Sequence, residues 1–384
     1  MKIKRIVIAI YTDPDFYPPT INAILNIAAS CDEVIVISRN NSLKDFNYPV
    51  NVLLKKVGKF SSVRASEQQP LWKKLVTFIR FTTQLLRYSV SRSTNLLLVY
   101  DQFALLSFFL VKGLIGKKKV WYHSHDMLDR NSLNKYSIGG FAAKYESVAM
   151  RHIHFFSLPA RERLAFYTKK DGISFFVIPN YPSLKVYKRP VAYSKDKDII
   201  KIIFQGFIGA GHALETLLVL LKEDFNNNGL HLVLKGSVTD RYKSAINGLA
   251  DQLTVSDKVT WLPIGPYSEL PAITASCHLG IGINMNTDAV SSTQGTASNK
   301  IYEYAASGLP VIVTDSTQFK QYLDTYTWVF FTDGSVQSLH GILNNIIQQL
   351  PALGASARKS FEETLNFEHG FCPAWGQVMQ QLKN

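Results

Sequence analysis

The stretch that decides the fold of this chain is Ser298 to Val313, which reads Ser-Asn-Lys-Ile-Tyr-Glu-Tyr-Ala-Ala-Ser-Gly-Leu-Pro-Val-Ile-Val. Its first half predicts a helix, which ends before Gly308 and which Pro310 prevents from continuing. The closing Val-Ile-Val is typical of a buried strand in a parallel sheet. A helix joined so closely to such a strand indicates a parallel α/β domain.

Two charged side chains of the predicted helix share one face. Lys300 and Glu303 are three positions apart, so both lie on the same side near the helix N-terminus. A helix N-terminus favours phosphate, a lysine adds positive charge, and a carboxylate one turn later can bind a pair of sugar hydroxyls. The combination suits a nucleotide-sugar. From this segment alone, an ordinary amphipathic helix with a surface ion pair is an equally good interpretation.

The same segment resembles the donor-binding signature of retaining glycosyltransferases with the GT-B fold, family 4 in particular. That signature runs Lys, aliphatic, aromatic, Glu-Tyr, small residues and Gly-Leu-Pro-Val-Ile. The resemblance implies that Glu303 contacts the ribose of a nucleotide-sugar. It also implies donor contacts around the start of the helix, at Ser298, Asn299 and Lys300.

Alternating strand-like and helix-like segments run through the whole chain, as in doubly wound parallel sheets. Strands are expected at residues 6–10, 34–38, 52–55, 96–100, 120–123, 155–157 and 176–178, and again at 201–205, 230–235, 259–262, 279–283, 311–313 and 328–330. Helices are expected at residues 20–30, 71–90, 104–114, 214–222, 240–253, 268–275 and 299–307.

This pattern and the resemblance predict an α/β protein of the GT-B class, with two Rossmann-like domains facing each other across a cleft. A length of 384 residues also exceeds what one hydrophobic core usually serves. The first domain, residues 1–185, would bind the acceptor, and the second, residues 198–365, the nucleotide-sugar. A C-terminal helix of about residues 366–384 would pack back on the first domain.

A glycine-rich turn follows the first strand of the second domain. Gly206 and Gly209 would let the backbone approach phosphates, although a purely structural turn is the simpler interpretation of glycines alone. In the resembled family a basic residue here meets the donor diphosphate, and this chain has His212 at that place. Either His212 binds phosphate, or the donor carries fewer phosphates, as a cytidine-monophosphate sugar does. Lys235, just before Gly236 at the next strand's end, could supply the missing charge.

The loop before the Glu303 helix departs from the resembled family. Many members have a second glutamate eight residues before the first, where this chain has Gly295. Contact with the donor sugar would therefore fall to the loop backbone and to Thr296 or Ser298.

The last clear strand of the first domain ends in Trp121-Tyr-His-Ser-His-Asp126. The resembled family has Tyr-Asp-x-His-Glu there, so His125 and Asp126 match its His-Glu pair and His123 replaces its aspartate. The carboxyl end of a strand is where active-site groups belong. A catalytic or sugar-contacting role for His125 and Asp126 is expected. A structural role, or metal binding by these two with His123, are the alternatives.

Charge is distributed unevenly along the chain. Residues 1–190 contain 29 Lys and Arg against 12 Asp and Glu, whereas residues 191–384 contain 13 against 17. Only the first domain is therefore expected to meet an anionic surface. The helix at 71–88 would pack its apolar face on the sheet and present basic residues to a membrane. These residues are Lys73, Arg80 and Arg87, with Lys55, Lys56 and Lys59 as exposed neighbours.

Several further features bear on the cellular location. No apolar stretch is long enough to span a bilayer, and the run at 6–10 is better explained as a first strand than as a secretory signal. Three widely spaced cysteines, Cys31, Cys277 and Cys372, fit a reducing compartment. We expect a cytoplasmic protein, peripheral at the inner face of the plasma membrane.

The resulting hypothesis is a glycosyltransferase that moves a sugar from a nucleotide-sugar to a glycan or lipid-linked acceptor in bacterial cell-envelope polysaccharide biosynthesis. Retention of configuration is implied by the resemblance, and neither a cofactor nor a metal is expected. One alternative is a nucleotide-sugar epimerase or hydrolase of GT-B-like fold. Another is a basic nucleic-acid-binding α/β protein, although no nucleic-acid motif is recognisable and no such partner is expected.

Overall fold

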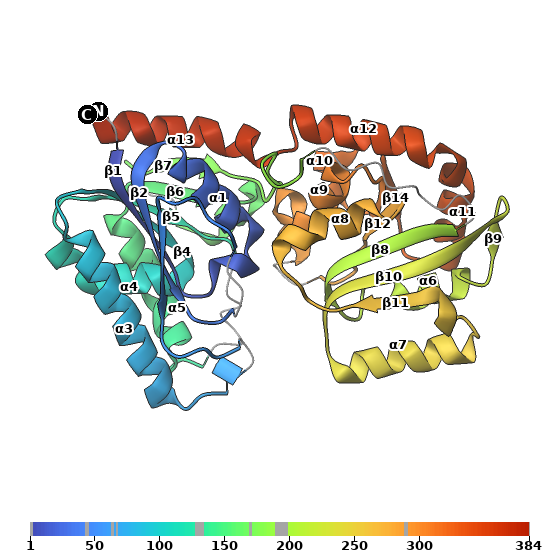
Figure 1. Ribbon diagram of the computed structural model, residues 1–384, viewed down its shortest axis with the longest axis horizontal. Coiled ribbons are helices and arrows are strands. Elements are labelled where there is room, and N and C mark those ends of the chain that lie inside the picture. Colours follow the sequence, from blue (N-terminus) through green and yellow to red (C-terminus); the bar gives the residue numbers. More distant parts are fainter. Residues whose placement is uncertain are drawn as a thin grey trace. The chain divides into compact units, whose positions relative to one another are not determined.

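The computed structural model describes residues 3–42, 46–62, 65–66, 68–126, 134–168, 171–188, 199–287 and 291–383. The chain divides into two compact units (Figure 1). Unit 1 comprises Met1–Pro179 together with Phe367–Asn384, and unit 2 comprises Asn180–Asn366. Each unit has its own sheet.

Unit 1 is built on a seven-stranded sheet in the order β3-β2-β1-β4-β5-β6-β7. All neighbouring strands are parallel. From β1 the chain adds β2 and β3 on one side and then β4 to β7 on the other. The carboxyl ends of β1 and β4 therefore form the switch point of the sheet, where ligands bind in such folds. The strands are β1 (Ile3–Ile10), β2 (Cys31–Arg39), β3 (Val52–Val57), β4 (Thr94–Tyr100), β5 (Lys119–His123), β6 (Phe155–Leu158) and β7 (Ser174–Val177).

Helices cover both faces of this sheet. They are α1 (Pro18–Ala28), α3 (Leu71–Ser89), α4 (Asp101–Ile115), α5 (Ile138–Ala149) and α13 (Phe367–Lys383). One core joins the sheet to α1 and α13, and another joins it to α3 and α4. The C-terminal helix is fixed by stacked aromatic rings, since Trp121 of β5 lies 5.9 Å from Phe371 and 6.4 Å from Trp375 between ring centres.

Unit 2 contains a second parallel sheet in the order β11-β10-β8-β12-β13-β14, with β9 (Asp224–Phe225) antiparallel to β10. The main strands are β8 (Ile199–Ile208), β10 (Asn228–Val238), β11 (Val259–Leu262), β12 (Leu279–Gly282), β13 (Val311–Thr314) and β14 (Val329–Thr332). Its helices are α6 (Leu214–Leu220), α7 (Asp240–Gln252), α8 (Leu270–Ala275), α9 (Asn299–Ala306), α10 (Thr317–Leu323), α11 (Val336–Ile346) and α12 (Leu350–Glu363).

The predicted α/β class is confirmed in both units. The segment from Ser298 to Val313 forms α9 and the fully buried strand β13, and Gly308 has the left-handed φ of +72° that ends the helix. Boundaries differ at several places. The helix expected at 268–275 begins as a 3₁₀ turn, Tyr267–Glu269, because Pro271 favours a new helix start. Much of the polar stretch before residue 199 lies outside the described residues.

Two predictions about the basic surface of unit 1 were wrong in detail. The helical period puts Leu71, Leu75, Phe78, Ile79, Leu85 and Leu86 of α3 on the apolar face predicted to pack on the sheet. Of these only Phe78 and Leu85 are buried, and Leu71, Leu75 and Ile79 are exposed. Lys55 and Lys56 are half-buried and are not the exposed charges that the sequence predicted. The ammonium of Lys56 forms an ion pair of 2.6 Å with the buried carboxylate of Asp13.

Candidate functional site

A pair of glycines forms the backbone floor of the candidate site in unit 2. Gly206 of β8 and Gly236 of β10 are opposite each other in the strand register, with φ of +119° and +144°. A Cβ atom on Gly236 would lie 1.9 Å from the carbonyl oxygen of Gly206. Only glycine therefore fits here, and the strand ends stay free of side chains that would keep a ligand away from the backbone.

Glu303 is buried beside this floor and is held by a chain of polar groups. The side-chain amide of Gln205 donates to Oε2 of Glu303 at 2.6 Å, and the hydroxyl of Thr274 lies 3.0 Å from Oε1 of Gln205. Burial raises the pKa of Glu303 from 4.5 to about 7, against the opposing effects of the Gln205 hydrogen bond and the Lys300 charge. Sequence reasoning did not assign roles to Gln205 and Thr274. Gln205 had a signal, its place directly before Gly206.

Lys300 brings its charge to the same edge. Its ammonium lies 4.1 Å from the ring centre of Phe204 and 3.7 Å from the place where a Cβ on Gly206 would stand. Burial lowers the pKa of Lys300 from 10.5 to about 8, while Glu303 opposes the shift. A buried acid and a half-buried base that both titrate close to neutral pH, at the carboxyl edge of a parallel sheet, are typical of a functional site.

His212 lies close by but in the wrong protonation state to hold phosphate at neutral pH. Its Nδ1 is 2.7 Å from the carbonyl oxygen of Ile283, so Nδ1 carries the hydrogen. Burial, together with the charge of Lys300, lowers the pKa of His212. The imidazole is therefore neutral at pH 7, and its Nε2 can accept but not donate a hydrogen bond. Lys300 is the charged group of the two.

The other predicted donor contacts occupy three places. Lys235 is buried and donates to the carbonyl oxygen of Pro263, so its ammonium is already engaged within unit 2. Thr296 and Ser298 lie in the turn before α9, which Asn180 anchors through hydrogen bonds of 2.9 Å to two of its carbonyl oxygens. Asn299 is the first residue of α9, and Gly209 follows β8 in the glycine-rich turn, where a Cβ would meet the ring of Phe207 at 2.9 Å.

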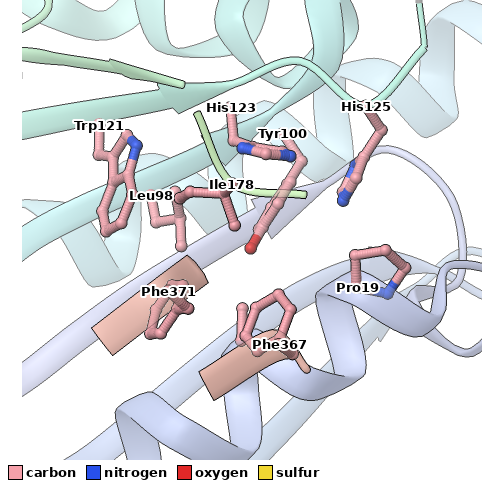
Figure 2. Close-up of a pocket in the computed structure, with 10 residues that line it drawn as sticks. Pro19, Leu98, Tyr100, Trp121, His123, His125, Ile178, Phe367 and Phe371 are labelled. Carbon is pink, nitrogen blue, oxygen red and sulfur yellow. The ribbon is translucent and has the colours of Figure 1, made fainter. Parts of the chain in front are cut away.

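In unit 1, His123 at the end of β5 and His125 just after it belong to a packed cluster of aromatic and histidine side chains (Figure 2). The imidazole of His125 is stacked between Tyr100 and Tyr17, at 4.6 Å and 5.2 Å between ring centres, and its Nε2 is 3.2 Å from the hydroxyl of Thr20. It is 2% exposed. Asp126, in contrast, is exposed, so it is the member of the predicted His125–Asp126 pair that a ligand can reach directly.

Asp101 holds this segment and was missed from the sequence. It is the first residue of α4 and has an unusual left-handed φ of +59°. Its Oδ1 accepts the backbone N–H of His125 at 2.8 Å, and its Oδ2 lies 3.6 Å from Nδ1 of the same residue. An acidic residue directly after the buried strand at 96–100 was the available signal.

His123 is part of the interior. Its Nδ1 is 2.7 Å from the hydroxyl of Ser157, which also accepts from the indole of Trp121, and burial lowers the pKa of His123 well below its usual range. The enclosed space beside these rings is about 10 Å³, enough for no more than one water molecule. Among the residues that the structure describes, no three His, Cys, Asp or Glu side chains are grouped closely enough to hold a metal ion.

This chain is similar to known proteins in its three-dimensional structure but not in its sequence. No protein-family model matches this chain, and no curated protein sequence matches it. Sucrose-phosphate synthase from Thermosynechococcus elongatus superimposes with a TM-score of 0.71 at 14% identity, covering 99% of each chain. HepE from Anabaena, solved in complex with UDP and glucose, gives a TM-score of 0.67 at 12% identity, also over 99% of each chain.

A third similar structure is WaaG, a glycosyltransferase involved in lipopolysaccharide biosynthesis, with a TM-score of 0.59 at 13% identity over 96% of this chain and 98% of that one. These proteins are glycosyltransferases of the GT-B type. The coverage extends over both units in each case. The chain therefore has the GT-B fold, as its sequence predicted.

Proposed function

We propose that this protein is a glycosyltransferase that takes its sugar from a nucleotide-sugar bound by unit 2. The observation that carries the proposal is the pairing of the half-buried Lys300 with the buried Glu303 beside the Gly206 and Gly236 floor. Together, the two side chains and the two glycines supply a cation, a carboxylate and open backbone at one edge of the sheet. The GT-B fold and the binding of UDP and glucose by HepE support the same reading.

Each group has a defined task in this proposal. Glu303 in its ionised form accepts hydrogen bonds from the two ribose hydroxyls. Lys300 and the first N–H groups of α9 stabilise the phosphates, and the glycines allow those phosphates to approach the backbone. The turn with Thr296 and Ser298 faces the sugar. Because Lys300 is the charged group near neutral pH, a diphosphate donor is favoured over one with fewer phosphates.

Transfer itself would depend on positioning and on charge stabilisation. As the acceptor hydroxyl oxygen bonds to the sugar, the bond between sugar and phosphate breaks and the hydroxyl proton passes to the departing phosphate, whose growing negative charge Lys300 would stabilise. Asp126 would contact the reacting sugars from unit 1, and His125 would position Asp126 through the shared segment. No metal or cofactor takes part in this scheme, and we propose retention of configuration.

The acceptor and the pathway are inferred from the charge of unit 1 and from one of the similar structures. We propose a glycan or a lipid-linked glycan of bacterial cell-envelope polysaccharide biosynthesis, bound by the basic unit 1 at the cytoplasmic face of the plasma membrane. The involvement of WaaG in lipopolysaccharide biosynthesis and the charge of residues 1–190 support this choice.

The experiment that tests the function is a thermal-shift screen of the full chain against uridine, guanosine, adenosine and cytidine nucleotides, followed by assays with the matching nucleotide-sugars. A transferase should bind one nucleotide class and release little free nucleotide until an acceptor glycan is added. Rapid release without acceptor would favour a hydrolase, and isomerisation of the bound sugar an epimerase. Binding of none of the four classes would refute the proposal.

A further inference from the structure

Unit 1 has another pocket, at the opposite edge of its sheet from His125 and Asp126. Its volume is about 410 Å³, and it lies where α4 ends, beside the 3₁₀ turn Met150–His152 and the residues just before β5 and β6. Because β5 and β6 are parallel, this is the amino edge of the sheet. β5 is five residues long, which at about 3.3 Å a residue separates the two edges by roughly 15 Å. The pocket is therefore distinct from the candidate site in unit 1.

The walls of this pocket carry charge of one sign. Six of the ten described residues that line it are basic, and none is acidic; the six are Lys112, Lys117, Lys118, Arg151, His152 and His154. Residues 102–125 and 147–161, which supply the whole described lining, contain no Asp or Glu. Helices α4 and α5 also end here, and each helix C-terminus carries a partial charge of about −0.5. Two such ends offset about one of the four full charges on lysine and arginine, so the pocket attracts anions.

Two of the basic side chains are held in place by backbone groups. The ammonium of Lys118 donates to the carbonyl oxygens of Ser91 and Thr94 at 2.8 Å and 2.9 Å, which fixes its charge in the wall. Nδ1 of His154 accepts the backbone N–H of Val120 at 3.2 Å, so the hydrogen of the neutral ring is on Nε2. Burial lowers the pKa of His154 and keeps this ring neutral at pH 7. His154 therefore offers one N–H donor whose position on the ring is fixed.

The other cations come from both walls of the pocket and are closer to solvent. Lys117 and Arg151 are exposed, and Lys112 is half-buried. The ammonium of Lys112 lies 4.6 Å from the ring centre of Phe109, and the ring of His152 lies 5.9 Å from the same ring. Phe109 thus brings the α4 wall and the wall of the 3₁₀ turn together, so that one ligand can contact both.

We propose that this pocket binds a small organic phosphate. A phosphate group carries up to about two negative charges and several acceptor oxygens, which match a set of lysines with an arginine. The buried side chains of Phe108 and Ile153 also line the pocket and provide apolar surface for the organic part of the ligand. The volume is within the range of about 300–1,000 Å³ that is usual for small-molecule sites.

This inference goes beyond the proposed function and does not depend on it. The ligand would lie at the edge of the sheet away from the transfer chemistry, as an additional bound molecule and not as a reacting group. A phosphate can also belong to a lipid headgroup. A concave lining favours a soluble molecule that enters the pocket, because the surface of a leaflet is flat. None of the described helices is both long and apolar enough to cross a bilayer.

The test is calorimetric titration of the full chain with inorganic pyrophosphate. Because Lys300 of unit 2 is also proposed to bind phosphate, the titration is repeated with Lys300→Ala, in which binding at the pocket should persist. Lys117→Glu with Arg151→Glu should weaken this remaining binding at least about tenfold. The matched control is Lys73→Glu with Arg80→Glu, which reverses two exposed charges on α3 of the same unit and should bind within about twofold of wild type.

Lysine acetylation followed by mass spectrometry locates the ligand in the wild type and so does not depend on the folding of a variant. Pyrophosphate should protect Lys112 and Lys117 but not Lys73. Equal binding by the pocket variant and its control, or equal acetylation of Lys117 with and without pyrophosphate, would overturn the inference.

Vesicles that contain phosphatidylglycerol distinguish the two sources of phosphate. If they bind through Lys117 and Arg151 while pyrophosphate does not bind, the pocket recognises a lipid headgroup and the proposal is wrong. Thermal melting should show that every variant folds. The nucleotide screen tests the proposed function separately, since a chain that transfers no sugar can still bind pyrophosphate in this pocket.

Discussion

At the scale of single residues, the site in unit 2 depends on two side chains whose pKa values are brought close together by burial. Glu303 titrates at about 7 instead of 4.5, and Lys300 at about 8 instead of 10.5. Desolvation is the main cause in both cases, because it penalises the charged forms. Their mutual attraction and the amide of Gln205 limit the shift.

We predict that Glu303→Ala abolishes transfer and weakens nucleotide binding at least about tenfold while the protein stays folded. Each charge-assisted bond to a ribose hydroxyl contributes roughly 1.5–3 kcal/mol. Calorimetric titration with the nucleotide found by the screen measures the loss. Glu363→Ala, at an exposed glutamate of α12, is the matched control. If Glu303→Ala binds nucleotide as tightly as the control, α9 does not bind the donor.

Nucleotide affinity should depend on pH through the same pair. It should rise as Glu303 ionises through pH 7, since the carboxylate is the better acceptor, and fall as Lys300 loses its proton through pH 8. Lys300→Arg should remove the alkaline decline, because an arginine stays charged. Titrations between pH 5.5 and 9.5 would show this, and a wild-type affinity that is flat across the range would contradict the assignment.

The sign of the stability effect is opposite for the two groups. The folded pKa of Glu303 is above its unfolded value, so its contribution to stability is full below about 4.5 and is lost as pH rises through about 7. The folded pKa of Lys300 is below its unfolded value, so folding gains stability as pH rises from about 8 toward 10.5. Ligand binding and stability therefore respond differently to pH, which lets one be separated from the other.

At the scale of elements, Asp101 links the carboxyl ends of β4 and β5. We predict that Asp101→Ala reduces transfer about tenfold without changing nucleotide binding by unit 2, because the N–H of His125 loses its acceptor and the segment shifts. Asp101→Asn keeps an acceptor and tolerates a positive φ, so it should restore most of the rate. Steady-state kinetics of both variants decide this. Full activity in Asp101→Ala would show that the link does not position the site.

At the scale of the whole molecule, the chain returns to unit 1 after completing unit 2. Phe371 of α13 is buried against Trp121. We predict that Phe371→Ala destabilises unit 1 by about 3–5 kcal/mol. Nucleotide binding by unit 2 should persist at temperatures where unit 1 has unfolded. Two resolved melting transitions, of which only one moves in the variant, would show this, whereas an unchanged melting profile would contradict it.

Much of this protein was determined by local sequence. Alternating apolar segments gave the strands and helices of both units, and Gly308 and Pro310 marked the junction of α9 and β13. These signals work because backbone geometry repeats with fixed periods and because glycine and proline act on their immediate neighbours. The candidate donor site was found in the same way, through the spacing of Lys300 and Glu303.

Only the tertiary structure determined the burial, the hydrogen-bond partners and the pKa values of those side chains. Gln205 reaches Glu303 across 98 positions of the chain, and the carbonyl oxygen of Ile283, 71 positions from His212, fixes which ring nitrogen of that imidazole carries the hydrogen. The same holds for α3, whose periodicity could not show which apolar residues the sheet would reach. Burial, pKa and exposure are set by groups that are distant in sequence and adjacent in space, so a local pattern does not contain them.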